Sequence, residues 1–304
     1  MSVNERDSQA WLRHARRGEF EAAWRASDRI LQRGSGVHDW TVPRHQQQIW
    51  NGSSLVGRRV LIRCYHGLGD TIQFIRYVPL VRALAREVTV WAQPALVPLL
   101  GSVAGIDRLL PLHDGTPEVE YDLDVEVMEL AYVFRSTLQT IPRVIPYLFA
   151  DPLALPGSSH PRVGLVWRAG EWDALRSIPF AMLTPLFRVR EVTWYSLQHG
   201  PGAGEQHRDL HQLNTSGLLR TAQCMRAMDL VISTDSMSAH LAGALGVPVW
   251  TLLPSNPDWR WMEDRSDSPW YPGMRLFRQP RAESWKPVIE EIIAALGTEV
   301  LAPR

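Results

Sequence analysis

The chain has 304 residues, of which 45% are hydrophobic and 21% are charged. That length exceeds the size at which one hydrophobic core stops growing, so two packing units are expected. Its 32 basic and 32 acidic residues cancel. This balance disfavours a nucleic-acid partner, because proteins that bind nucleic acids present a basic surface.

The cysteine content predicts a reducing compartment. Cys64 and Cys224 form neither a CxxC pair nor a disulfide framework. No apolar run approaches the ~18 residues that span a bilayer, and the first residues lack the apolar core of a signal peptide. We therefore expect a cytoplasmic protein with at most peripheral contact at the inner face of the membrane.

Residues 9–33 carry apolar side chains at helical spacing in two arms separated by Gly18. This pattern predicts a helical hairpin within a first segment, residues 1–48. The second arm resembles the second helix of a tetratricopeptide repeat, which cannot bury its apolar face alone. The hairpin is therefore either a cap that packs on the rest of the chain or the remnant of a repeat array that binds a protein partner.

Residues 49–157 have the pattern of one α/β domain. Short apolar runs at 59–65 and 87–93 predict buried parallel strands, with a helix between them. Further strands are expected at 108–111 and 122–126. This segment is predicted to be a Rossmann-like, doubly wound domain that binds the acceptor.

Residues 158–304 repeat the pattern after a linker rich in proline, glycine and serine. The expected elements are strands at 161–167, 192–198, 229–234 and 247–253, and helices at 238–245 and 286–296. Two Rossmann-like domains in succession are typical of the GT-B architecture, in which a cleft between the domains binds the ligand. The second domain is expected to bind a nucleotide sugar.

The turn after the first predicted strand carries the sequence HGLGD, residues 66–70. Sheets of α/β proteins bind ligands at the carboxyl ends of their strands, and glycines permit close approach. Asp70 is a candidate general base for an acceptor hydroxyl. Alternatively, Asp70 and Gln73 form a helix capping box. The other residues expected to line an acceptor cleft here are Gly67, Leu68, Gly69 and Gln73.

A second candidate site spans residues 232–246, where a predicted strand passes into a predicted helix. Free amides and the dipole at a helix start favour a diphosphate, and the hydroxyls of Ser236 and Ser238 add donors. His240 is a candidate donor to a phosphate or a sugar, unless a backbone neighbour satisfies it. The alternative is an ordinary helix start whose amides bind nothing.

Arg168 and Arg176 lie on a predicted loop at residues 167–179. A guanidinium group keeps its charge at any working pH and grips phosphate through two hydrogen bonds. Such a loop can neutralise a departing nucleotide diphosphate without a metal. The alternative is a pair of solvated arginines.

Metal ligands are disfavoured. His207 and His211 have i, i+4 spacing but no neighbouring cysteines. Asp122 and Asp124 form a D-x-D string inside an alternating strand pattern, where structural carboxylates are expected. We predict no metal and no cofactor other than a nucleotide-sugar co-substrate.

Thirteen tryptophans are unusual for this length, and several lie between residues 250 and 285. Their rings either stack on a sugar and close the cleft or pack in a core. The residues concerned are Trp259, Trp261 and Trp270, beside Arg260. The charged residues of an alternative surface salt network are Asp258, Glu263, Asp264 and Arg265.

Several stretches together resemble glycosyltransferase family 9, the heptosyltransferase-like enzymes, and in particular the branch found behind tetratricopeptide repeats in bacterial proteins. Within residues 50–295 the matching stretches are GLGDTIQFIRYVPL, VGLVW with RSIPF, YSLQHG, DLVISTDSMSAHLAGALGVPVW and PDWRWMEDRSDSPWYPGMRLFRQ. The resemblance implies an inverting, metal-independent GT-B transferase with Asp70 as catalytic base. The donor-binding residues expected on this basis are Arg168, Arg176, Gln198, Asp235, Ser236, Met237, Ser238 and His240.

The donor and acceptor stay open at this point. The family often carries a threonine-glycine pair where this chain has Ser236 and Met237, so a donor of ADP-heptose type is an expectation only. The acceptor is a hydroxyl on a glycan, a lipid-linked saccharide or a protein. The main rival is a catalytically silent GT-B-like scaffold that docks a partner through its hairpin. An epimerase or another dinucleotide enzyme is disfavoured, because Ile72 stands where the third glycine of a dinucleotide fingerprint would fall.

Overall fold

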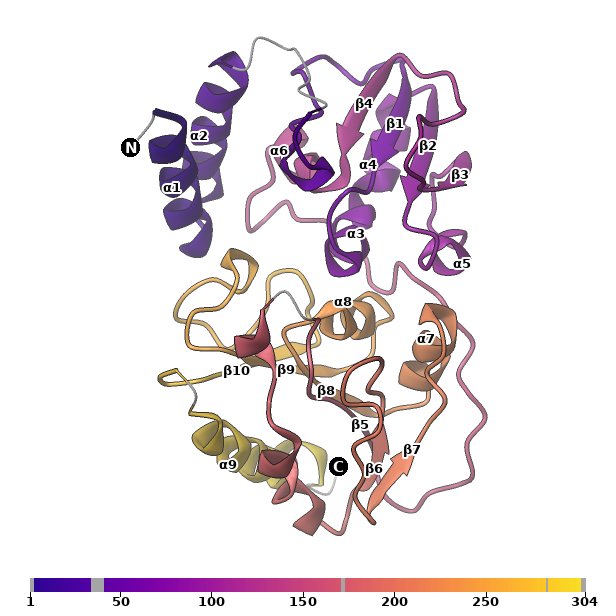
Figure 1. The fold of residues 1–304 in the computed structure, drawn as a ribbon, viewed down its shortest axis with the longest axis vertical. Helices are drawn as coiled ribbons and strands as arrows, with labels where there is room; N and C mark the ends of the chain where they lie inside the picture. The colour runs from indigo at the N-terminus through magenta and orange to yellow at the C-terminus, as the bar shows by residue number, and fades with distance from the viewer. Residues whose placement is uncertain (1–2, 34–40, 171–172, 283, 302–304) are drawn as a thin grey trace. The chain divides into compact units, whose positions relative to one another are not determined.

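The structure is a computed structural model that describes residues 3–33, 41–170, 173–282 and 284–301. The chain forms two compact units (Figure 1). The N-terminal unit consists of Met1–Tyr147 and Asp258–Asp264, and the C-terminal unit of Leu148–Pro257 and Arg265–Arg304. Residues 171–172 of the predicted arginine loop lie outside the described residues. Among the helices that are described, none is long and apolar enough to cross a membrane.

The predicted hairpin is present as α1 (Val3–Arg16) and α2 (Phe20–Arg33). Gly18 turns the chain between them with φ of 72°, a conformation that favours glycine. The hairpin packs on the rest of its unit, since the indole of Trp24 donates to the carbonyl of Ser136 over 2.7 Å. Asp28 of α2 also pairs with Arg135. In this structure the apolar face is therefore covered by the chain itself, which favours the packing-cap interpretation.

The N-terminal unit contains a parallel sheet of β1 (Arg59–Arg63), β2 (Glu87–Ala92), β3 (Arg108–Pro111) and β4 (Leu123–Glu126), in the order β3-β2-β1-β4. Val60 of β1 pairs with Val88 of β2 and with Leu123 of β4. The helices of this unit are α3 (Leu68–Phe74), α4 (Val78–Leu84), α5 (Val97–Leu100) and α6 (Leu130–Val133). Its 3-10 turns are η1 (Arg44–Gln46), η2 (Ile75–Tyr77), η3 (Val127–Glu129) and η7 (Trp259–Trp261).

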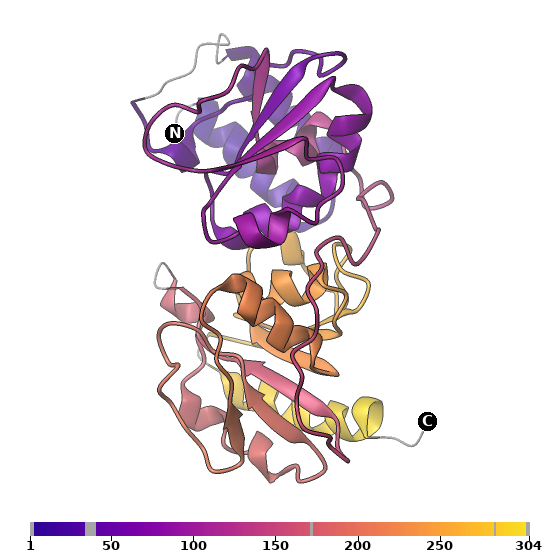
Figure 2. The same cartoon turned by 90° about the vertical axis from the view of Figure 1, so that its right-hand side faces the viewer.

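The C-terminal unit contains a second parallel sheet, in the order β10-β9-β8-β5-β6-β7. The strands are β5 (Arg162–Val166), β6 (Thr193–Ser196), β7 (Leu210–Gln212), β8 (Leu230–Thr234), β9 (Val249–Leu253) and β10 (Met274–Arg278). Helices α7 (Leu218–Arg226) and α8 (Met237–Ala244) lie on one face, and α9 (Trp285–Ala295) lies on the other (Figure 2). Shorter turns are η4 (Ala174–Arg176), η5 (Phe180–Leu183), η6 (Leu186–Arg188) and η8 (Leu296–Val300).

The predicted fold class is confirmed, because both units are α/β with parallel sheets and a helical hairpin precedes the first. Strands β7 and β10 were not predicted. The domain boundaries at residues 48, 157 and 158 stay predictions. One segment differs from them: residues 258–264 pack with the N-terminal unit. The physical reason is aromatic contact, since the ring of Trp259 lies 5.1 Å from that of Trp11 in α1.

Candidate active site

Asp70 lies in the first turn of α3, directly after the carboxyl end of β1. Gly67 is the N-cap of this helix, and the Gly67 amide donates to Oδ2 of Asp70 over 2.9 Å. A capping box is therefore present, but it is formed by Gly67 and Asp70 and not by Asp70 and Gln73 as predicted. Asp70 occupies the third helical position instead of the cap. Its carboxylate holds the helix start while its side chain keeps 19% of its surface exposed.

A cation lies against Asp70. Nη2 of Arg260 donates to Oδ1 of Asp70 over 2.7 Å, and the Arg260 side chain is only 9% exposed. Asp258 fixes this arginine by accepting from its backbone amide at 3.0 Å and from its Nε at 2.9 Å. The guanidinium is thus held between two carboxylates, through charge-assisted hydrogen bonds to Asp258 and to Asp70.

A second titratable cluster occupies the same sheet edge, where β4 ends beside β1. Nδ1 of His66 lies 2.9 Å from Oε1 of Glu126, at ion-pair distance but outside the geometry of an aligned hydrogen bond. Glu126 is buried and accepts from the amides of Tyr65 and Met128. Burial of the His66 ring opposes its charge, but Glu126, helped by Asp70 and Glu129, outweighs burial and raises the pKa of His66.

Glu129 is a buried carboxyl group next to this cluster. Its oxygens accept from the amides of Ile49 at 3.1 Å, Trp50 at 2.9 Å and Glu126 at 2.9 Å. Burial raises the pKa of Glu129 to about 7, against the backbone hydrogen bonds that lower it. The carboxyl group therefore exchanges its proton near neutral pH, within the same turn that follows β4.

The remaining residues predicted to line an acceptor cleft lie in or beside α3. Leu68 and Gly69 form its first turn, and Gln73 is fully buried one turn further on. The Gln73 carboxamide has no hydrogen-bond partner among the described residues. A buried, unsatisfied amide costs about 1–3 kcal/mol, so this residue is held by packing rather than by polar contacts.

The tryptophan segment is buried. Trp259 is 8% exposed and Trp261 is fully covered, so core packing describes both rings better than an open sugar-stacking surface. Met262 adopts φ of 54° with ψ of −178°, a region that costs about 1–3 kcal/mol outside glycine. A strained backbone conformation persists only where the surrounding contacts hold it. The packing around Met262 therefore fixes the backbone at this position.

Two of the charged residues named for the alternative salt network, Asp258 and Arg265, form ion pairs with residues outside that set. Asp258 pairs with Arg260, whereas Arg265 pairs with Asp267. Trp270, which the sequence placed beside these residues, is buried in the C-terminal unit instead.

In the C-terminal unit, Arg176 reaches the turn that precedes α8. Its Nη1 donates to the carbonyl of Asp235 over 3.1 Å, and its side chain is 15% exposed. Ser236 is the N-cap of α8, and its Oγ accepts from the amide of Ser238 at 3.3 Å. Asp235 is itself buried, and Met237 begins the helix. The structure thus places a fixed guanidinium beside a helix N-terminus, two groups that attract phosphate.

His240 is buried within α8, and its Nδ1 lies 3.0 Å from the hydroxyl of Tyr271. The predicted alternative to ligand binding was a backbone partner, and the structure adds a side-chain partner, the hydroxyl of Tyr271. Tyr271 also covers Gly243, where an added Cβ would lie 2.4 Å from the ring. The tyrosine therefore fixes the helix that carries the predicted anion site.

Gln198 and Arg168 meet at the carboxyl end of β5. Oε1 of Gln198 accepts from the amides of Trp167 at 3.0 Å and Arg168 at 2.9 Å. The Arg168 side chain is 42% exposed and pairs with Glu205 at 3.3 Å. Gln198 thus shapes the loop by accepting hydrogen bonds from its backbone amides.

The disfavoured metal candidates lie in ordinary structural contacts. Asp122 pairs with Arg59 and Asp124 with Arg63, and hydrogen bonds from Arg59 lower the pKa of Asp122 to about 2. His207 stacks on Phe187, and His211 packs against Tyr195. Over the described ranges, no group of three or more His, Cys, Asp or Glu side chains is arranged to hold a metal ion.

Sequence reasoning missed the partners of the predicted residues. It named Arg260 without connecting it to Asp70, because 190 positions separate them. It gave no role to His66, although this residue opens the HGLGD turn. Glu126 was overlooked beside the D-x-D string, yet its place at the end of a strand that neighbours β1 was a usable signal.

Comparisons with known proteins bear on the fold. No family model matches the chain. A glycosyltransferase family 9 structure from Veillonella parvula is 13% identical, covers 83% of this chain and 99% of that one, and has a TM-score of 0.57. ADP-heptose lipopolysaccharide heptosyltransferase II of Escherichia coli is 14% identical, with coverage of 80% and 98% and a TM-score of 0.56. The chain has the fold of the family 9 heptosyltransferases.

The chain is also similar to an iron-containing glycosyltransferase and to a longer bacterial protein. The iron-containing dodecameric glycosyltransferase TibC of enterotoxigenic E. coli is 14% identical, covers 83% of this chain and 82% of its own, and has a TM-score of 0.54. Protein FlbA of Caulobacter vibrioides is 25% identical over 300 aligned positions, covering 81% of this chain and 48% of FlbA. The chain therefore spans about half the length of the curated relative that it matches.

Proposed function

We propose that the protein is a glycosyltransferase that moves a sugar from a nucleotide-diphosphate donor to an acceptor hydroxyl, with inversion and without a metal ion. The observation that carries the proposal is the contact of Arg176 with the carbonyl of Asp235, at the start of α8. A donor diphosphate needs both positive charge and amide donors, and this turn supplies both. The heptosyltransferase fold supports the same class of reaction.

The proposed reaction uses Asp70, a residue of the N-terminal unit, and Arg176, a residue of the C-terminal unit. The acceptor hydroxyl gives its proton to Asp70 while its oxygen forms a bond to the anomeric carbon, on the face opposite the diphosphate. The bond from that carbon to the phosphate oxygen breaks, and its electron pair leaves with the diphosphate. Arg176 and the first amides of α8 stabilise the new negative charge.

The substrates follow from chemistry and resemblance. A donor of ADP-heptose type is the first to test, because heptosyltransferase II, whose fold this chain shares, is named for ADP-heptose. The acceptor is proposed to be a hydroxyl on a glycan, a lipid-linked saccharide or a protein, encountered in the cytoplasm or at the inner face of the membrane.

Calorimetry with ADP, GDP, UDP and CDP tests the donor site. We expect one nucleotide to bind the wild-type protein and Arg176→Gln to weaken that binding at least tenfold. Arg190→Gln is the matched control, because Arg190 is an exposed arginine of the same unit that pairs with Asp209 at 3.1 Å. Binding of no nucleotide would favour the rival scaffold function instead.

Turnover of the corresponding sugar donor tests catalysis. Asp70→Asn should lower the rate of transfer by about 10²–10⁴-fold while nucleotide affinity is unchanged. The anomeric configuration of the product, measured by NMR, decides whether transfer inverts. Full activity after chelator treatment supports metal independence, whereas activity lost to the chelator and restored by iron contradicts it.

A further inference from the structure

Residues 258–264 are held by the hairpin at both ends. The ring of Trp259 meets Trp11 edge-on at 5.1 Å and Phe20 at 6.3 Å, so it contacts both α1 and α2. At the other end, the amide of Glu263 donates to the carbonyl of Arg16 over 2.8 Å. The segment is therefore attached to the hairpin by side chain and by backbone.

The same segment is attached to the helix that carries Asp70. The ring of Trp259 stacks on Phe74 of α3 at 6.4 Å. The guanidinium of Arg260 lies 5.7 Å from the centre of the Trp259 ring and donates to Asp70. Trp259 thus lies between the hairpin and α3, and its neighbour Arg260 is the residue that reaches the candidate base.

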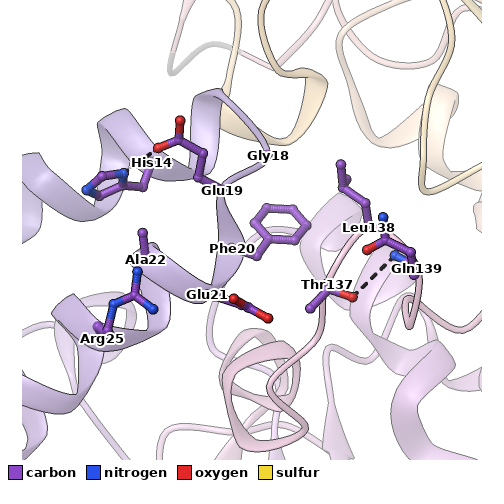
Figure 3. Close-up of a pocket in the computed structure, with 10 residues that line it drawn as sticks. All are labelled: His14, Gly18, Glu19, Phe20, Glu21, Ala22, Arg25, Thr137, Leu138 and Gln139. Atoms are coloured by element: carbon purple, nitrogen blue, oxygen red, sulfur yellow. Dashed lines mark hydrogen bonds and ion pairs between the residues drawn. The ribbon is translucent and has the colours of Figure 1, made fainter.

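The turn of the hairpin meets the segment at Gly18. A Cβ added there would lie 3.2 Å from Sδ of Met262 and 3.2 Å from Cδ1 of Leu138. The turn also borders a cavity of about 510 Å³ lined by His14, Glu19, Phe20 and Thr137 among others (Figure 3). Met262 thus lies against the turn, in addition to the aromatic contacts of Trp259 and the hydrogen bond of Glu263.

We propose that the N-terminal hairpin is a positioning element of the glycosyl-transfer site, in which Trp11 holds Trp259 so that Arg260 stays on Asp70. This inference rests on the proposed function. Trp11 touches none of the reacting groups in this scheme and acts through Arg260. The hairpin thereby has a role in the reaction that neither a passive cap nor a partner-binding remnant has.

Kinetics of Trp11 variants test the proposal. Trp11→Ala should lower kcat about tenfold with the KM for the donor unchanged, because the donor site lies in the other unit, and Trp11→Phe should retain most of the activity. Leu12→Ala is the control on the same helix, since Leu12 is 37% exposed. In an Arg260→Gln background, Trp11→Ala should cause less than a twofold further loss. If the loss of kcat in the double variant equals the product of the losses in the two single variants, the two residues act independently and the proposal is overturned.

Hydrogen exchange separates this proposal from the proposed function. Residues 258–264 should exchange faster in Trp11→Ala than in the wild type, while β1 and β2 keep their protection. A wild-type protein that binds donors without turning them over contradicts the proposed function and, with it, a role of the hairpin in transfer. Unchanged exchange and unchanged kcat in Trp11→Ala overturn the positioning role alone.

Discussion

Nη2 of Arg260 donates to Oδ1 of Asp70 over 2.7 Å, although the two residues are 190 positions apart in the chain. Arg260 also holds Asp258, so one largely buried guanidinium neutralises two carboxylates. Removing the arginine leaves both negative charges in a partly buried site, where water compensates them poorly.

Arg260→Gln should therefore lower the free energy of unfolding of the N-terminal unit by about 1–3 kcal/mol. Urea denaturation followed by tryptophan fluorescence measures this change. Arg108→Gln provides the control, because Arg108 is 60% exposed and pairs with Glu87 at the surface. Its loss should cost less than about 1 kcal/mol. Equal effects of the two variants would contradict the importance of the buried pair.

Glu129 predicts a pH dependence of stability. Burial raises its pKa from 4.5 to about 7, so between these values the native state keeps a proton that the unfolded chain has released. The free energy of unfolding should then fall as the pH rises through this window, by on the order of 3 kcal/mol. Glu129→Gln cannot titrate, so its stability should lack this component. Parallel pH profiles of the two proteins would disprove the assignment.

Glu126 should control the ionisation of His66. Burial of the ring opposes its charge, and the carboxylate of Glu126 raises the pKa of His66 despite that burial. Glu126→Gln removes the negative charge, so the pKa of His66 should fall, as followed by NMR of the ring protons and assigned with His66→Gln. Glu120→Gln should leave the titration unchanged, because Glu120 is exposed and pairs with Arg59. A rise of the pKa in Glu126→Gln would refute this relationship.

Gly243 should tolerate no side chain. A Cβ at this position would lie 2.4 Å from the ring of Tyr271, which also contacts His240. Gly243→Ala should destabilise the C-terminal unit by about 1–3 kcal/mol and weaken nucleotide binding, because α8 or Tyr271 must shift. Gly157→Ala, in the same unit and with open space around its added Cβ, should be close to neutral in thermal unfolding.

Much of this architecture is readable from local pattern. Buried parallel strands such as β1 and β8 are continuous apolar runs, and the Asp70 and Ser236 turns follow directly from them. Strand β7 has only three residues, and β10 lies inside the tryptophan-rich stretch, so neither has a clear period. The pairing of Arg260 with Asp70 could not be predicted from local sequence pattern. It depends on the packing of Trp259 against rings that are distant in the sequence.

The discontinuous N-terminal unit has a consequence for synthesis of the chain. Its first 147 residues are synthesised before β5, but Trp259 and Arg260 are added more than a hundred residues later. Until then Trp11, Phe20 and Phe74 lack the ring that packs against them, and Asp70 lacks its cation. Domains usually fold in order as they emerge. Here the N-terminal unit can reach its final packing only after nearly all of the C-terminal sheet has been translated.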